Sequence, residues 1–190
     1  MSEQQSGQLA AHDVYLGLGA NLAKPIAQIQ HAITALQQLP QSTLLAVSSL
    51  YGSKPMGPQD QPDYVNAVAK ISTRLAPLAL LDALQQIELQ QGRQRKAERW
   101  GPRSLDLDIL LYASQTMVSE RLTIPHYGLA QREFVLYPLA EIAPRLQLPC
   151  GTPLQALLSQ VPLNGLQKLS ETCSEQLAAA GTLCDLAHPE

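Results

Sequence analysis

Two oppositely charged groups of residues adjoin between Gly92 and Leu110, in the segment GRQRKAERWGPRSLDLDIL. Five of the chain's 13 lysines and arginines fall within residues 93–103, and Asp106 and Asp108 follow, one residue apart. The whole chain has a net charge of only −3. The basic run is therefore a feature of a local site, not of a protein drawn to polyanions over its whole surface.

The acidic pair has the spacing that places both side chains on one face of a β-strand. In a strand over LDLDIL, Asp106 and Asp108 share a face with Cα atoms about 6.6 Å apart, while Leu105, Leu107 and Ile109 point into the core. Two such carboxylates repel each other unless a cation neutralises them, and their hard oxygens suit Mg²⁺. Two Mg²⁺ ions about 3.5–4 Å apart could share the pair.

A simpler interpretation is that the aspartates form the solvated face of an edge strand, since an Asp-x-Asp motif alone is weakly specific. The apolar residues Leu110 and Leu111 favour a central strand instead. We therefore interpret the pair as metal ligands on a central strand.

The basic run precedes the acidic pair. Arg95 and Lys96 are explained by their place after a helix C-terminus, where cations complement the helix dipole. Three arginines that flank the Trp-Gly-Pro turn at 100–102 are explained less well in this way: Arg93, Arg99 and Arg103. Guanidinium groups on both sides of an aromatic hinge suit a lid that closes on phosphate. We expect the opposite charges to meet through a Mg²⁺-bound triphosphate and not through each other.

Other candidate residues lie on either side of this segment. His126 stands in TIPHYGLAQREF with Thr123, Tyr127 and Arg132, although a lone histidine there is also typical of a turn. Two aromatic residues, Tyr64 and Phe134, are typical of packing, but they could sandwich a flat heterocycle whose edge is read by Asn66. The phosphate-loop and dinucleotide fingerprints GxxxxGK[ST] and GxGxxG are absent.

The elements that must position these residues follow from the apolar periodicity. Strands are predicted at 14–21, 43–51, 64–73 and 105–112, and helices begin at Pro25 and Pro77, the second ending near Gly92. A loop is predicted at 52–63, a small hairpin in VSERLTIP, and a third helix at 131–143 interrupted by Pro138. The order strand, helix, strand, strand, helix, strand predicts a ferredoxin-like α+β fold with a βαββαβ core and an antiparallel sheet flanked by helices.

Composition bounds the class of protein. The chain has 190 residues, 45% of them hydrophobic and 15% charged, which fits one globular domain. We expect a flexible tail at 1–11, a domain at 12–163 and a peripheral extension at 164–190. Cys150, Cys173 and Cys184 are interpreted as reduced thiols. Without a secretory leader or a long apolar run, the sequence predicts a cytoplasmic protein that binds neither membrane nor nucleic acid.

Four segments together resemble the 6-hydroxymethyl-7,8-dihydropterin pyrophosphokinase family of folate biosynthesis: YLGLGANL, GPQDQPDYVNAV, IELQQGRQRKAERWGPRSLDLDILLY and LTIPHYGLAQREFVLYPLAEIAP. The resemblance spans about residues 13–150. It implies an ATP- and Mg²⁺-dependent monomer in which the pterin hydroxymethyl oxygen attacks the β-phosphorus of ATP and AMP leaves.

The resemblance also implies roles for individual residues. Asp106 and Asp108 would bind two Mg²⁺ ions, and Arg93 and Arg103 would stabilise the transferring and leaving phosphates. The nucleotide site would be lined by Gln85, Glu88, Lys96, Arg99, Trp100, Ile109, Arg121, Thr123, His126, Tyr127 and Arg132. The pterin would be bound by Ser53, Met56, Tyr64, Asn66 and Phe134. Lys54 stands where relatives often carry a first proline, so we expect a change in loop stiffness.

Three alternatives remain from the residues alone. A palm-type nucleotidyltransferase or cyclase would also present paired aspartates on a ferredoxin-like sheet. An RNA-binding module could use the basic patch at 93–103, although the net charge and the lack of an aromatic ladder speak against it. A non-catalytic scaffold would require substitutions that inactivate the site, yet none of the positions that match the family is lost.

Overall fold

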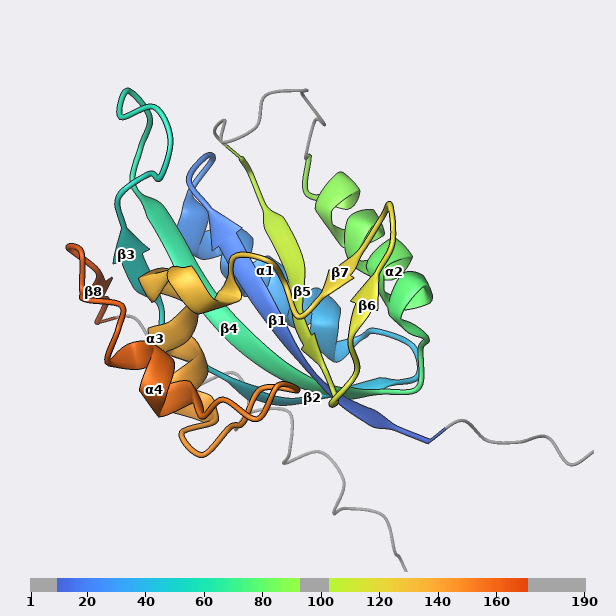
Figure 1. The fold of residues 1–190 in the computed structure, drawn as a ribbon. Helices are drawn as coiled ribbons and strands as arrows, with labels where there is room; N and C mark the ends of the chain where they lie inside the picture. The colour runs from blue at the N-terminus through green and yellow to red at the C-terminus, as the bar shows by residue number, and fades with distance from the viewer. Residues whose placement is uncertain (1–9, 93–102, 171–190) are drawn as a thin grey trace, which may run out of the picture.

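The computed structural model describes residues 10–92 and 103–170. Its framework is a six-stranded antiparallel sheet in the order β5-β1-β4-β3-β8, with β2 also paired to β4 (Figure 1). The strands are β1 His12–Ala20, β2 Ser42–Val47, β3 Tyr51–Ser53, β4 Tyr64–Thr73, β5 Asp106–Tyr112 and β8 Gln167–Lys168. The main strands thus have the predicted ferredoxin-like arrangement, in which the first and third strands of the core lie in the middle.

Two short strands share one edge of β4. β2 pairs with residues 69–73 of β4, whereas β3 pairs with residues 64–66. Between them, the Ser48 side chain accepts a hydrogen bond from Val68 N–H. The predicted single strand at 43–51 is therefore two strands, and Gly52 and Ser53, predicted to lie in a loop, belong to β3. That prediction was wrong because pairing with β4, which local composition does not reveal, extends the strand.

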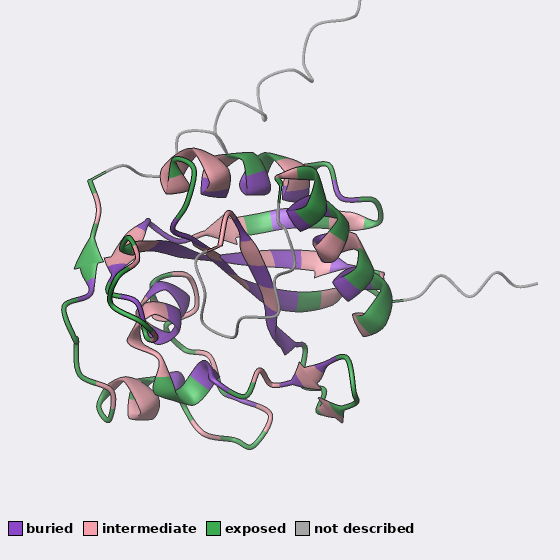
Figure 2. Ribbon diagram, turned by 90° about the horizontal axis from the view of Figure 1, so that it is seen from above, coloured by how far each residue is buried: buried purple, intermediate pink, exposed green. Residues whose placement is uncertain are grey.

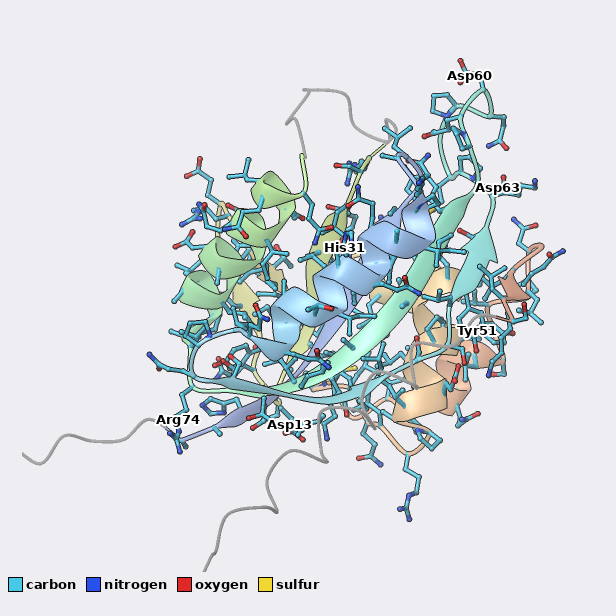
Figure 3. All side chains as sticks on the ribbon, turned by 180° about the vertical axis from the view of Figure 1, so that it is seen from behind. Asp13, His31, Tyr51, Asp60, Asp63 and Arg74 are labelled. Carbon is cyan, nitrogen blue, oxygen red and sulfur yellow. The ribbon has the colours of Figure 1, made fainter. Side chains whose placement is uncertain are left out.

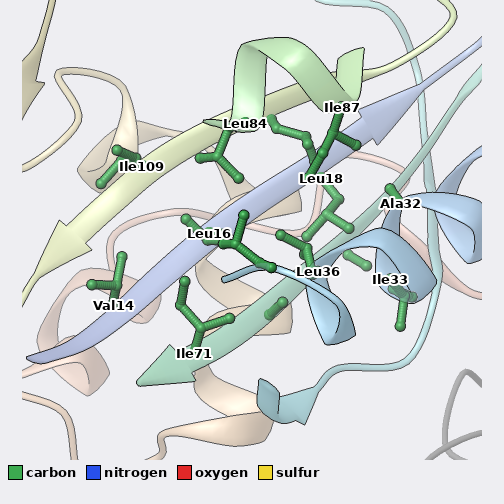
Figure 4. Packing of buried hydrophobic residues seen from close by; sticks show 14 of the residues in the cluster. Val14, Leu16, Leu18, Ala32, Ile33, Leu36, Ile71, Leu84, Ile87 and Ile109 are labelled. Carbon is green, nitrogen blue, oxygen red and sulfur yellow. The ribbon is translucent and has the colours of Figure 1, made fainter. Parts of the chain in front are cut away.

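Two helices cover one face of the sheet, as the apolar stripes predict. α1 (Pro25–Gln37) and α2 (Pro77–Gln90) each begin with a proline. Proline is favourable there because a backbone N–H at the first position of a helix has no acceptor within the helix, so none is lost. Figure 4 shows Ile33 and Leu36 of α1 and Leu84 of α2 packed around residues of β1. Gly92 follows α2 with a φ of 81°, in the left-handed region that favours glycine at a helix end. The exposed sides of these helices face outward in Figure 2.

The opposite face of the sheet is covered by α3 (Glu133–Ile142) and α4 (Leu154–Leu158), which follow the 3₁₀ turn η1 (Leu129–Gln131). α3 packs over β4 in a second apolar cluster that includes Val68 and Leu136. Pro138 does not interrupt α3, contrary to the prediction. A proline inside a helix costs about 3 kcal/mol, but each buried Val or Leu contributes roughly 1.5–3 kcal/mol, and α3 buries three of them on the sheet.

β5 is an edge strand, so the prediction of a central strand was wrong. Among the described residues it pairs only with β1. Its apolar residues are explained by helices on both faces of the sheet and not by strands on both sides. The predicted hairpin forms from β6 (Met117–Val118) and β7 (Thr123–Ile124), and the chain after it covers the outer edge of β5, where His126 N–H donates to Leu110 O.

The two ends of the sheet differ. Figure 3 shows Asp60 and Asp63, in the loop between β3 and β4, at one end and Asp13 and Arg74 at the other. The N-terminal end of β5 lies at the same end as that loop (Figure 1).

None of the helices within residues 10–92 and 103–170 is long and apolar enough to cross a membrane.

Candidate active site

A cavity of about 240 Å³ lies between the sheet, the 54–63 loop and the segment that leads into α3. Its floor comes from the middle strands, at Gly19 of β1 and Asn66 of β4. Eleven of the predicted site residues line it: Ser53, Met56, Tyr64, Asn66, Arg103, Asp106, Asp108, His126, Tyr127, Arg132 and Phe134. Residues as far apart in the sequence as Ser53 and Phe134 thus meet in one place.

The acidic pair points into this cavity. Asp106 and Asp108 line it, while Leu107 and Ile109 belong to the core on the helix side of β5, which confirms the predicted alternation. Protein atoms surround much of the Asp108 carboxylate, and this loss of hydration raises its pKa to about 7, with the neighbouring charge of Asp106 as the next cause. The side chain still has 42% of its surface open. The site therefore stores unfavourable negative charge that a cation would relieve.

The arginine before the acidic pair already contacts it. The Arg103 guanidinium donates a hydrogen bond from Nη1 to Asp106 Oδ2, so the expectation that the opposite charges meet only through a nucleotide was wrong for this pair. Burial by itself would lower the pKa of Arg103, but the adjacent Asp106 raises it above the ordinary value. Arg103 is therefore a fixed cation at the rim of the acidic site.

His126 lies on the other side of the acidic pair. Gly128 N–H donates to His126 Nδ1 over 3.1 Å, which places the ring proton on Nε2, and Nε2 lies 3.8 Å from Asp108 Oδ2. Burial, and then the charge of Arg132, lower the His126 pKa to about 4. At neutral pH this imidazole is therefore uncharged, with an N–H donor directed toward the acidic pair.

Arg132 forms the wall next to His126. Its guanidinium carbon lies 5.3 Å from the Tyr127 ring centroid and 5.9 Å from that of Phe134. A Cβ atom at Gly128 would lie 2.5 Å from Arg132 Nε, so the absence of a side chain there makes room for the guanidinium. Sequence reasoning missed Gly128, whose role depends on a contact that only the folded chain creates.

The other end of the cavity combines an amide with aromatic rings. Asn66 is buried, and its Nδ2 donates to Ser53 Oγ over 2.8 Å and to Tyr51 O over 3.4 Å. These contacts fix the orientation of the amide, and Tyr64 and Phe134 line the same cavity. This part of the cavity therefore combines aromatic rings with a fixed amide.

Asn21 was also missed, although it ends the segment GLGAN. Its side chain, 2% exposed, donates to Gln61 Oε1 and Pro62 O, both over 3.1 Å, and accepts from Arg103 N–H over 2.8 Å. Asn21 N–H also donates to Arg103 O. The residue thus joins the 54–63 loop to the start of the acidic segment. A polar residue after an apolar strand was the only sequence signal.

Several predicted residues lie away from the cavity. Glu88 is buried and accepts a hydrogen bond from Leu107 N–H over 2.7 Å, and Ile109 packs in the core on the helix side. The Arg121 guanidinium contacts Asp82 of α2. Gln85 on α2 and Thr123 on β7 do not line the cavity either. Arg93, Lys96, Arg99 and Trp100 lie outside the described residues.

The carboxylates of Asp106 and Asp108 fit a Mg²⁺ ion that is bound together with phosphate. Within the part of the chain that the structure describes, no three Asp, Glu, His or Cys residues gather to hold a metal. Two carboxylates alone suit Mg²⁺, which completes its shell with phosphate oxygens and water. The pKa of Asp108 is raised first by burial and then by the charge of Asp106, and a bound cation would lower it.

Together, fold and cavity define a ferredoxin-like α+β protein whose cavity is lined by carboxylates, arginines and aromatic rings. Comparison with known proteins identifies the family. The family model for 7,8-dihydro-6-hydroxymethylpterin-pyrophosphokinase (HPPK) matches residues 15–144, and the chain belongs to this family.

Curated relatives agree over nearly their whole length. A Pseudomonas aeruginosa protein named 2-amino-4-hydroxy-6-hydroxymethyldihydropteridine pyrophosphokinase is 56% identical over 156 residues, covering 82% of this chain and 96% of its own. A Haemophilus influenzae protein of the same name is 54% identical, covering 82% and 97%. A solved structure of the A437G variant of Plasmodium falciparum HPPK-DHPS, at 13% identity, shares the fold with a TM-score of 0.63 over 82% of this chain and 46% of that one.

Proposed function

We propose that the cavity transfers a pyrophosphoryl group from ATP to the hydroxymethyl group of 6-hydroxymethyl-7,8-dihydropterin, a step of tetrahydrofolate biosynthesis. The observation that carries this proposal is that Asp106 and Asp108 line the same cavity as Asn66, Tyr64 and Phe134. Family membership and 56% identity to a named pyrophosphokinase support it. The products are AMP and the pterin diphosphate.

The pterin occupies the aromatic end. Tyr64 and Phe134 stack on its faces, and Asn66 pairs with its edge, supported by the Ser53 hydroxyl. Met56 is exposed at the rim of this pocket, where it closes over the ring. Water is thereby kept away from the reacting groups. It would otherwise compete with the hydroxymethyl oxygen as a nucleophile that attacks the β-phosphorus.

ATP occupies the charged end. Asp106 and Asp108 would hold two Mg²⁺ ions, which when bound would neutralise phosphate charge and increase the electrophilicity of phosphorus. Arg103, Arg132 and the neutral His126 supply donors to phosphate oxygens, and Tyr127 lies beside them. By resemblance to the family, further nucleotide contacts come from Gln85, Glu88, Arg93, Lys96, Arg99, Trp100, Ile109, Arg121 and Thr123.

The residues act by positioning and charge compensation. The hydroxymethyl oxygen forms a bond to the β-phosphorus, the bond from that phosphorus to the bridging oxygen of the α-phosphate breaks, and AMP leaves with this oxygen. The hydroxyl proton is released to solvent. Transfer of this kind needs in-line alignment and stabilised phosphate charge more than a strong base. The low pKa of His126 keeps its imidazole neutral, and the hydrogen bond from Gly128 N–H to Nδ1 leaves Nε2–H as the donor.

The test is the identity of the nucleotide product. The full chain is incubated with ATP, Mg²⁺ and the reduced hydroxymethylpterin, and nucleotides are separated by chromatography. We expect AMP in amounts equal to pterin consumed, and none without pterin. ADP would contradict pyrophosphoryl transfer, whereas cyclic nucleotide or free pyrophosphate would indicate a palm-type cyclase or nucleotidyltransferase.

Calorimetry with a non-hydrolysable ATP analogue tests the metal. We expect tight binding only with Mg²⁺, at two ions per chain, followed by pterin binding. An RNA-binding function would instead appear as a salt-dependent shift of RNA that excess ATP and Mg²⁺ do not reduce.

We further propose that the protein is a cytoplasmic monomer. Sedimentation at micromolar concentration tests the oligomeric state.

A further inference from the structure

The C-terminal strand β8 lies one strand away from the proposed pterin pocket. β8 pairs with β3 in the register Tyr51 to Lys168 and Gly52 to Gln167, and Leu169 N–H donates to Leu50 O over 2.8 Å. β3 ends at Ser53, whose hydroxyl accepts the hydrogen bond from Asn66. The position of β3, and so of Ser53, depends on a segment more than 110 residues later in the chain.

Apolar contacts fix β8 against β3. Leu166 is buried, and Leu169 packs against the apolar core that lies between the sheet and the helices α1 and α2. A Cβ at Gly52 would lie 3.4 Å from Leu169 Cδ2, so the bare backbone of Gly52 forms the surface on which Leu169 rests. This packing acts on the residue next to Ser53.

Glu141 adds a polar connection between β3, β8 and α3. Its Oε1 accepts from Ser49 Oγ over 2.7 Å and from Lys168 Nζ over 3.3 Å, and its Oε2 accepts from Tyr51 OH over 2.7 Å. Glu141 lies in the last turn of α3, whose first turn carries Phe134. The same cluster therefore joins the strand that carries Ser53 to the helix that carries Phe134.

We propose that residues 166–169, with Glu141, form a brace that sets the distance between β3 and α3 and thereby the affinity for the pterin. The inference rests on the proposed function, because it assigns the pocket between these walls to the pterin. The brace acts through Ser53 and Phe134, so these C-terminal residues position the site and do not touch substrate. The acidic pair on β5, at the opposite edge of the sheet, lies outside its reach.

The test is the variant Leu169→Ala in the full chain, with Leu163→Ala as matched control, since Leu163 precedes the brace and is 57% exposed. Dissociation constants for a pterin analogue and for a Mg²⁺-ATP analogue are measured by calorimetry, with kcat and KM alongside. Because a site loosened in its supporting shell loses affinity, we expect Leu169→Ala to raise the pterin constant and KM about five-fold. The ATP-analogue constant, kcat and all values for Leu163→Ala should change less than about two-fold.

A second variant guards against simple unfolding. Glu141→Gln keeps the size of the side chain but replaces the carboxylate whose oxygens accept hydrogen bonds from Ser49 and Tyr51. Like Leu169→Ala, it should raise the dissociation constant for the pterin analogue. A lower melting temperature with unchanged pterin affinity in both variants would overturn the proposal, as would equal losses for pterin and nucleotide. Because binding is measured directly, selective loss of pterin affinity would support the brace even if no AMP formed, which would contradict only the proposed reaction.

Discussion

His126 Nε2 lies 3.8 Å from Asp108 Oδ2, yet the two groups do not form a charged pair. Burial, together with Arg132, keeps the imidazole neutral by lowering its pKa, while loss of hydration raises the pKa of the carboxyl. Burial thus disfavours both charges, whereas Arg132 disfavours the charge of His126 and favours that of Asp108. Under the proposed function, the charge of a metal-bound polyphosphate would favour the ionised form of Asp108.

Replacement of Asp108 should separate activity from stability. A raised carboxyl pKa means that the folded state binds its proton more tightly than the unfolded state, so this group's contribution to stability is present below about pH 4 and is lost as the pH rises through about 7. Asp108→Asn should therefore stabilise the ligand-free protein at pH 8. After discounting for its 42% open surface, we expect on the order of 1 kcal/mol. Turnover should fall by about 100-fold or more.

Denaturant unfolding at pH 4 and pH 8, with AMP formation, checks this prediction. Asp13→Asn is the control, because Asp13 pairs with Lys70 over 2.6 Å at the far end of β1 and should leave turnover unchanged. Near-normal turnover of Asp108→Asn would remove the metal assignment.

Metal-dependent nucleotide binding should strengthen with pH. Below about pH 7 a proton competes with Mg²⁺ for Asp108, and above it the carboxylate is available. Titrations of Mg²⁺ with a fixed ATP analogue should give a dissociation constant that falls about five- to ten-fold from pH 6 to pH 8. Asp108→Asn should flatten this dependence. A dependence of the same slope in the variant would show that another group titrates.

His126 should remain neutral throughout the physiological range. Its pKa of about 4 lies below the unfolded value near 6.5, so the unfolded state binds the proton first and stability falls as the pH decreases from 6.5 toward 4. Proton NMR should show one imidazole signal, absent from His126→Gln, that titrates near pH 4. A midpoint near 6.5 would contradict the buried neutral state.

Gly128 should be required for the position of Arg132. Its φ of −92° is accessible to alanine, so Gly128→Ala should fold normally while its new Cβ displaces Arg132 Nε. A shift of about 1 Å in a phosphate-binding group should raise the ATP-analogue dissociation constant about five- to ten-fold. In an Arg132→Ala background the same substitution should add no further loss. An additive loss would show that Gly128 acts by another route.

Lys54 and Asp63 should act as an ionic clasp at the base of the 54–63 loop. Lys54 Nζ contacts both oxygens of Asp63, at 2.8 and 3.1 Å. Both side chains are exposed, so a double-mutant cycle on pterin affinity should give a coupling of about 0.5 kcal/mol. Screening in about 1 M salt should abolish it. The charge-reversed pair Lys54→Asp with Asp63→Lys should restore affinity. Failure of this reversal would indicate that Lys54 acts without its partner.

The sequence by itself determined which side chains share a face. The alternation over Asp106 and Asp108 places both in the cavity, and the stripes of α1 and α2 place both helices on the sheet, because side-chain direction within an element follows from backbone geometry alone. The motifs around these residues also indicated the family. Local composition could not show that β5 is an edge strand, since burial on two faces and pairing on two sides both produce an apolar run.

Only the tertiary structure decided which distant residues support the site. Asn21 reaches Arg103 across 82 positions and Glu141 reaches Ser49 across 92, and neither partner carries a periodic signal that names the other. Such contacts depend on the paths of loops and on strand pairing, which bring polar groups together only after the core has formed. A buried polar side chain then remains stable because its partners compensate for lost hydration, and those partners exist only in the folded chain.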